Sequence, residues 1–174
     1  NKDKSKVLVF CKRKPQNIDW EFLYNGQRLE ITDEYKHLGV LFNYTGSCLK
    51  HRKYVCSQAQ KAMYALMRKN RCLDLPIDIQ FELFDRMVEP ILLYGCEVWG
   101  YESLGILEKV HIKYCKYVLG LKSSTPSCMV YGETGRYPLN VRVKQRMINY
   151  WAKLIYASES KLDSILYKTL YRYH

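Results

Sequence analysis

The sequence predicts an α+β protein, mainly α, with small N-terminal antiparallel strands followed by a bundle of helices. Three observations support this class. The first 45 residues contain a short apolar run and a hairpin turn, apolar residues take up helical spacing from Ser47 onward, and 48% hydrophobic and 14% aromatic content is enough for a core. We expect strands in residues 1–45, helices in 46–121 and a helical extension in 122–174.

The first strand is expected at residues 7–11, where apolar residues follow one another directly. A continuous apolar run of this length is typical of a strand that is covered on both faces. The polar stretch that ends at Pro15 stops the run.

A two-residue hairpin turn is predicted at Asn25-Gly26, because both residues tolerate the positive φ of such a turn. Glu21 and Glu30 would then lie opposite each other, an unfavourable pair unless that face is wet or meets a cation. Counting outward from the turn pairs Tyr24 with Gln27, Phe22 with Leu29, and Trp20 with Ile31.

A long basic helix is predicted between Ser47 and Leu73, a segment with seven Lys or Arg and no acid. At about 100° per residue, one side of this helix is apolar, with Val55, Ala59, Ala62, Met63 and Leu66. The opposite side carries what we call the basic stripe: Lys50, Lys53, Lys61, Arg68 and Arg71, with Tyr64 among them. Arg52 and Lys69 fall outside it. A solvated helix usually mixes charges to gain i,i+4 pairs, so a one-signed stripe indicates an anionic partner.

The remaining chain has helical spacing with short breaks. Asp74 is expected to cap a helix with Pro76 in its first turn, and Pro90 to kink or split that helix. A further helix should end at Gly120, and another should follow Pro138 after a loop-rich stretch. The apolar stripes are Phe81, Phe84, Val88, Ile91 and Leu92, then Leu107, Val110, Tyr114, Val118 and Leu121, then Val143, Met147, Tyr150, Trp151 and Leu154, and last Leu162, Ile165, Leu166 and Leu170.

The charge balance predicts a polyanionic partner. Lys and Arg number 28 against 17 Asp and Glu, which gives a formal net charge of +11. Nucleic acid is the first expectation and an anionic membrane surface the second. No apolar run reaches the roughly 18 residues that a membrane span requires, and the N-terminus has no signal-peptide pattern. We expect a soluble, intracellular protein.

The sequence predicts no catalytic or metal site in this chain. Its seven cysteines are irregularly spaced without a C-x-x-C pair and its four histidines are scattered, which argues for free thiols and against a disulfide framework or a zinc site. Nucleotide-binding loops and the zinc-protease and hydrolase motifs are missing. Glu82, Asp85 and Glu89 share helical spacing but are interpreted as a solvated face, not as a two-metal cluster.

Four segments, by their order, resemble parts of the reverse transcriptases of non-LTR (LINE-type) retrotransposons: residues 1–5, 35–40, 90–100 and 132–139. Asn1, Lys4 and Ser5 match an Asn-x-x-Lys-[Thr/Ser] element that leads into a palm strand. The second segment, Tyr35-Lys36-His37-Leu38-Gly39-Val40, is similar to the hairpin called the primer grip, with His37 where tyrosine is more usual.

The resemblance implies a role for each candidate residue. Lys4 would lie near the phosphates of the incoming nucleotide, unless it only flanks a strand. Tyr35, Lys36, His37 and Gly39 would hold the primer end, with a tight strand bend as the plainer interpretation of Gly39. The basic stripe would lie along the phosphates of the template–primer duplex. Tyr64 would stack or bond a sugar there, or else cover a helix seam.

The same resemblance assigns residues 1–45 to the palm edge, 46–121 to the thumb and 122–174 to a post-thumb extension. The fingers, the rest of the palm, the catalytic aspartates and the Mg²⁺ that they bind would lie outside this chain, which alone should not polymerise. The implied partners are an RNA template, a DNA primer and the missing palm and fingers, in the nucleus and cytoplasm.

Other interpretations stay open. A helical protein-interaction module would use the basic helix to bind an acidic partner, and a gene remnant would fold without a present role. We expect Trp99 and Trp151 in the core, since large aromatic side chains on apolar stripes normally pack. Four further cations either extend the binding surface or form a solvated cluster: Arg136, Arg142, Lys144 and Arg146.

Overall fold

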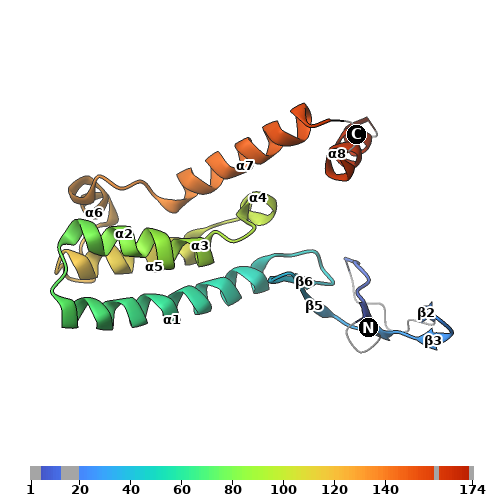
Figure 1. The fold of residues 1–174 in the computed structure, drawn as a ribbon, viewed down its shortest axis with the longest axis horizontal. Coiled ribbons are helices and arrows are strands. Elements are labelled where there is room, and N and C mark those ends of the chain that lie inside the picture. The colour runs from blue at the N-terminus through green and yellow to red at the C-terminus, as the bar shows by residue number, and fades with distance from the viewer. Residues whose placement is uncertain (1–4, 13–19, 159–160, 173–174) are drawn as a thin grey trace.

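The computed structural model describes residues 5–12, 20–158 and 161–172, and it is mainly helical with a few small strands (Figure 1). The predicted α+β class is confirmed. The strands are β1 (Lys6–Val7), β2 (Leu23–Tyr24), β3 (Gln27–Arg28), β4 (Glu30–Ile31), β5 (Glu34–His37) and β6 (Val40–Asn43). The helices are α1 (Leu49–Leu73), α2 (Ile77–Met87), α3 (Glu89–Leu92), α4 (Cys96–Trp99), α5 (Gly105–Val118), α6 (Ser127–Thr134), α7 (Leu139–Tyr156) and α8 (Leu162–Arg172).

The predicted register of the Asn25-Gly26 hairpin is confirmed next to the turn and is wrong farther out. Tyr24 pairs with Gln27, and the Leu29 amide donates to the Phe22 carbonyl at 2.8 Å. Beyond this point β4 leaves the hairpin and pairs with β1 in parallel, so Ile31 lies beside Val7 and not beside Trp20. Two cations meet the acidic residues of the hairpin: Arg28 lies 3.4 Å from Glu21, and Lys6 lies 2.9 Å from Glu30.

The prediction of a strand covered on both faces at residues 7–11 is wrong. Only Lys6–Val7 form a strand, and Phe10 is 59% exposed. Among the described residues β1 is hydrogen-bonded to β4 alone, and a two-stranded sheet offers too little surface to cover both faces.

A second hairpin, β5–β6, leads into α1. His37 pairs with Val40 across a two-residue turn at Leu38-Gly39, and both turn residues have positive φ. The hairpin is fixed to the helix by His51, whose Nδ1 accepts a hydrogen bond from the Leu41 amide at 3.2 Å. The N-terminal end of α1 and the β5–β6 hairpin are therefore held together.

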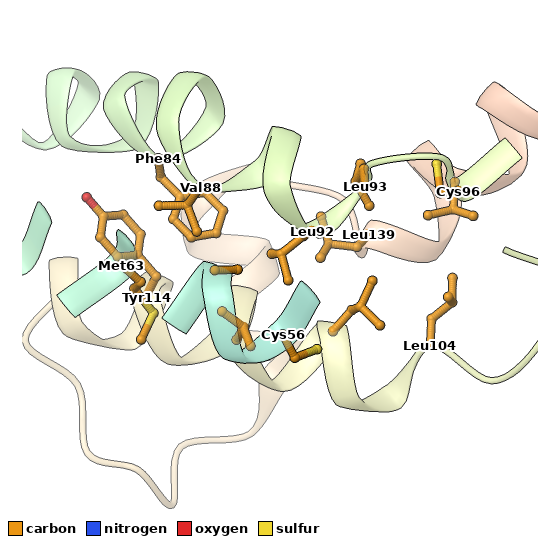
Figure 2. Close-up of a cluster of buried hydrophobic side chains, with 14 of the residues drawn as sticks. Cys56, Met63, Phe84, Val88, Leu92, Leu93, Cys96, Leu104, Tyr114 and Leu139 are labelled. Carbon is orange, nitrogen blue, oxygen red and sulfur yellow. The ribbon is translucent and has the colours of Figure 1, made fainter. Parts of the chain in front are cut away.

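Helices α1 to α5 and α7 form one core, with α2, α3 and α5 lying between α1 and α7 in the view of Figure 1. Met63 from α1, Phe84 from α2 and Tyr114 from α5 are fully buried, and the Phe84 and Tyr114 rings stack with centroids 4.6 Å apart (Figure 2). Leu139, at the start of α7, joins the same cluster. The apolar stripes predicted for α1 and for α2–α3 are confirmed as buried or partly buried.

Several helix boundaries differ from the predicted ones. Asp74 does not begin a helix: it is the C-cap of α1, with φ of 44°, and Pro76 is the N-cap of α2. The stretch before Pro138, which we expect to be loop-rich, contains the eight-residue helix α6. The split at Pro90 and the break at Gly120, where φ is 65°, are confirmed.

The C-terminal helices bury less apolar surface than expected. Trp99 is 1% exposed, as predicted, but Trp151 is 51% exposed, so its assignment to the core is wrong. Its Nε1 donates to the Tyr167 hydroxyl at 2.7 Å, because α8 packs on α7 at this point. The apolar stripe of α8 lies largely at the surface: Leu162, Ile165, Leu166 and Leu170 are all exposed.

Candidate nucleic-acid interface

Helix α1 is the element that positions the basic stripe. Its 25 residues contain neither glycine nor proline and are rich in strong helix formers. Val55, Ala59, Met63 and Leu66 are buried on one side, against α3 and α5. The five stripe cations, Lys50, Lys53, Lys61, Arg68 and Arg71, are all exposed on the other side. The predicted division of this helix into an apolar and a basic face is thus present in the structure.

Three of the stripe cations have no ion pair with any described residue: Lys53, Lys61 and Arg68. Lys50 pairs with Glu34 of β5, where both side chains are substantially exposed. An exposed pair of this kind stabilises by about 1 kcal/mol at most. Arg71 lies over the Tyr117 ring, 5.7 Å from its centroid. Its positive charge in the last turn of α1 also interacts favourably with the helix dipole.

Arg52 confirms that not every cation of α1 belongs to the stripe. Its side chain is buried, donates to the Ser103 carbonyl and pairs with Glu102. This arginine therefore joins α1 to the loop before α5 and is a structural residue.

The β5–β6 hairpin divides the predicted primer-grip residues between two faces, because successive strand residues point to opposite sides. Lys36 turns toward α1, where its Nζ donates to the Tyr54 hydroxyl at 2.6 Å and lies 4.6 Å from the ring centroid. Tyr35 and His37 stack together on the other face, with centroids 6.3 Å apart. The structure thus places Lys36 against the basic helix, on the face opposite the Tyr35 and His37 stack.

Gly39 has a local packing function. Its φ is 86°, and a Cβ at this position would lie 3.0 Å from the Tyr94 ring. Tyr94 covers the turn and donates its hydroxyl to the Leu38 carbonyl at 2.7 Å. The close approach expected at Gly39 is thus made by a tyrosine of this chain. Lys4, the remaining candidate from this part of the sequence, lies outside the described residues.

Tyr64 contacts a cation of another helix. The Lys113 ammonium of α5 donates to the Tyr64 hydroxyl at 2.6 Å and lies 5.0 Å from the ring centroid. The ring lies beside the contact between α1 and α5 and remains 44% exposed.

Of the three acids predicted to form a solvated face, Glu82 is exposed, whereas Asp85 and Glu89 are ion-paired with arginines of distant segments. Asp85 receives two hydrogen bonds from Arg136, and the buried Glu89 pairs with Arg142. Burial raises the pKa of Glu89, and the Arg142 charge opposes that shift. Arg136 and Arg142 are consequently not part of an open cationic surface.

A histidine extends this charged cluster into the core. His111 accepts a hydrogen bond from Arg136 at Nε2, so its Nδ1 carries the proton toward Glu108, 3.2 Å away. Burial alone would raise the pKa of Glu108, but hydrogen bonds from His111, Tyr131 and the Leu139 amide lower it overall. Sequence patterns give no signal for this cluster, since Arg136, Asp85 and Tyr131 lie far from His111 in the chain and only Glu108 is close to it.

The described residues hold no group of three or more His, Cys, Asp and Glu side chains placed to bind a metal. All seven cysteines are free, as predicted, and burial raises the pKa of Cys56, Cys96 and Cys115 to about 11. Within the described ranges, none of the helices combines the length and the hydropathy that a membrane crossing requires.

Comparisons of the chain with protein-family models, with curated proteins and with solved structures each find no match.

Proposed function

We propose that this chain is the palm edge, thumb and post-thumb part of a retrotransposon reverse transcriptase, and that it grips a template–primer duplex through the basic stripe of α1. The observation that carries the proposal is a long helix with only positive charges on its exposed face and its other face buried in the core. Lys53, Lys61 and Arg68 have no charged partner among the described residues, so their charge is available to a polyanion.

The length of the stripe suits a duplex. Lys50 and Arg71 are separated by roughly 32 Å at 1.5 Å per residue. One turn of B-form duplex rises about 34–36 Å. A straight helix of this length can therefore meet phosphates over close to one turn.

The residue types suit binding without sequence preference. The flexible, positively charged side chains of lysine and arginine bind phosphates by charge attraction. Base readout instead requires side chains that are held against base edges in a groove. A polymerase must move along any sequence, so contact with the backbone is the mode that this function needs. The resemblance places polymer synthesis, Mg²⁺ and the catalytic aspartates in the missing palm, and the working compartments in the nucleus and cytoplasm.

A helical protein-interaction module is the second candidate, and the exposed apolar side chains of α7 and α8 favour it. Ile148, Leu166 and Leu170 are each more than half exposed. In that case the basic stripe would bind an acidic protein surface.

The affinity for short RNA–DNA hybrids separates the two candidates. The variant Lys53→Gln/Lys61→Gln/Arg68→Gln is compared with Lys153→Gln/Lys161→Gln/Arg172→Gln, which removes the same charge from other exposed positions. We expect the parent chain to bind two hybrids of unrelated sequence equally, and the stripe variant to bind both at least about tenfold more weakly. The control variant should stay within about threefold of the parent chain. Absence of binding, or equal losses in the two variants, contradicts the proposal.

A further inference from the structure

Helix α5 carries a second row of cations beside the basic stripe. Lys109, Lys113 and Lys116 recur at helical spacing on the side of α5 away from its buried residues Leu107, Val110 and Tyr114. We call them the α5 row. The one acid of α5, Glu108, is turned away and accepts hydrogen bonds from His111, Tyr131 and the Leu139 amide. The outer face of α5 is thus also one-signed.

The α5 row and the basic stripe are fixed to each other. Lys113 of the row donates to Tyr64 of the stripe at 2.6 Å. A second link lies farther along: Tyr117 of α5 donates its hydroxyl to the Met67 carbonyl of α1 at 2.9 Å, and Arg71 covers the same ring. The two rows therefore lie on adjoining helices whose axes are about 8–10 Å apart, the ordinary spacing of packed helices.

The lysines of the α5 row keep donors free for a ligand. A lysine ammonium has three donors. Lys113 directs one of them to Tyr64, and Lys116 directs one to the Ser123 carbonyl at 2.6 Å. Lys109 has no ion pair with a described residue.

A hollow of about 480 Å³ lies beside the α5 row, lined by Lys113 and Lys116 together with Met67, Ile112, Tyr117, Leu121 and Ser123. Its walls are largely apolar, whereas its rim carries ammonium groups. A duplex presents two phosphate chains with a groove between them, and A-form helices have a wide, shallow minor groove. Two adjoining rows of cations on neighbouring helices match two phosphate chains, whereas one strand has a single phosphate chain.

We propose that the α5 row binds the phosphates of the second strand of the duplex, while the basic stripe binds the first. The inference rests on the proposed function and adds what that function leaves open, namely that this surface selects a duplex over a single strand. Tyr64 is then a positioning residue: it holds the Lys113 ammonium between the rows.

The test is the variant Lys109→Gln/Lys113→Gln/Lys116→Gln, measured with an RNA–DNA hybrid and with its RNA strand alone. We expect at least about a tenfold loss of affinity for the hybrid and a slope of log affinity against log salt that is shallower by about 2.7, which is three contacts at 0.9 each. Affinity for the single strand should change less than about threefold. The Lys153→Gln/Lys161→Gln/Arg172→Gln variant is the matched control.

Two results overturn the inference. Unchanged hybrid affinity and slope would remove the α5 row from the interface, and the proposed function would still stand if the stripe variant loses binding. Equal losses for the hybrid and the single strand would contradict the assignment to a second strand.

Tyr64 is tested separately by Tyr64→Phe, which keeps the ring and removes the hydroxyl that Lys113 bonds. If it acts through Lys113, the losses of Tyr64→Phe and Lys113→Gln are not additive in the double variant. Additive losses would contradict the positioning function.

Discussion

At the scale of single residues, charge was predictable and charge pairing was not. The exposure of Lys53, Lys61 and Arg68 follows from helical spacing alone, because a helix with one apolar side must turn its other side to water. The pairing of Arg136 with Asp85 joins residues 51 positions apart, and no local pattern reports which distant acid an arginine will meet. The predicted burial of Trp151 fails for a related reason: only the tertiary structure shows which side of α7 other helices cover.

Arg136 gives a prediction at this scale. Its side chain is 10% exposed, it bonds both Asp85 oxygens, and it lies 5.0 Å from the Phe81 ring centroid. Arg136→Ala should lower the free energy of unfolding by about 2 kcal/mol, because it removes two hydrogen bonds to the Asp85 carboxylate and the bond to the buried His111, while Asp85 keeps Arg142 at 3.6 Å. Urea denaturation followed by circular dichroism measures this loss.

Arg86→Ala is the matched control. Arg86 forms an exposed i,i+4 pair with Glu82, for which a loss of about 0.5 kcal/mol or less is expected. Similar losses in the two variants would show that the Arg136 pair is no more important than a surface pair.

At the scale of elements, long periodic segments were predicted well and short ones poorly. Helix α1 has a sustained apolar side, so its extent and its faces were evident from the sequence. Helix α6 was missed because its eight residues, which include Gly132, show no sustained apolar stripe. The short β1 was overestimated because apolar residues that follow one another indicate a covered strand only where further strands cover it.

Ser57 gives a prediction at this scale, since it is exposed at the centre of the basic stripe with Lys53 and Lys61 four residues away on either side. Ser57→Glu would create two i,i+4 ion pairs and should raise the free energy of unfolding by about 0.5–1 kcal/mol. It should also weaken binding to an RNA–DNA hybrid by about tenfold, because the added charge repels phosphate and neutralises neighbouring lysines.

Ser57→Gln separates charge from helix propensity, which improves in both variants. We expect Ser57→Gln to bind the hybrid like the parent chain. If Ser57→Glu is more stable and binds the hybrid as tightly as the parent chain does, the result contradicts a binding function of the basic stripe.

At the scale of the whole molecule, the sequence predicted the class and the order of elements but not which helices meet. The contacts between α1 and α5 that place the two rows of cations side by side join residues about 50 positions apart, as in the bond from Lys113 to Tyr64. Helix α8 packs on α7 and leaves the apolar side chains of its stripe exposed. Both features depend on tertiary contacts that periodicity does not encode.

The central claim is that the exposed cations of α1 neutralise phosphates of a nucleic-acid backbone. The most direct test is the affinity of the chain for an RNA–DNA hybrid measured across about 50–200 mM salt, the range in which counterion release dominates. We predict that log affinity falls with log salt with a slope of at least about 2.7 in magnitude, and that Lys53→Gln/Lys61→Gln/Arg68→Gln reduces the magnitude by about 2.7 at 0.9 per lost contact. A slope near zero, or one that the three substitutions leave unchanged, would contradict the claim.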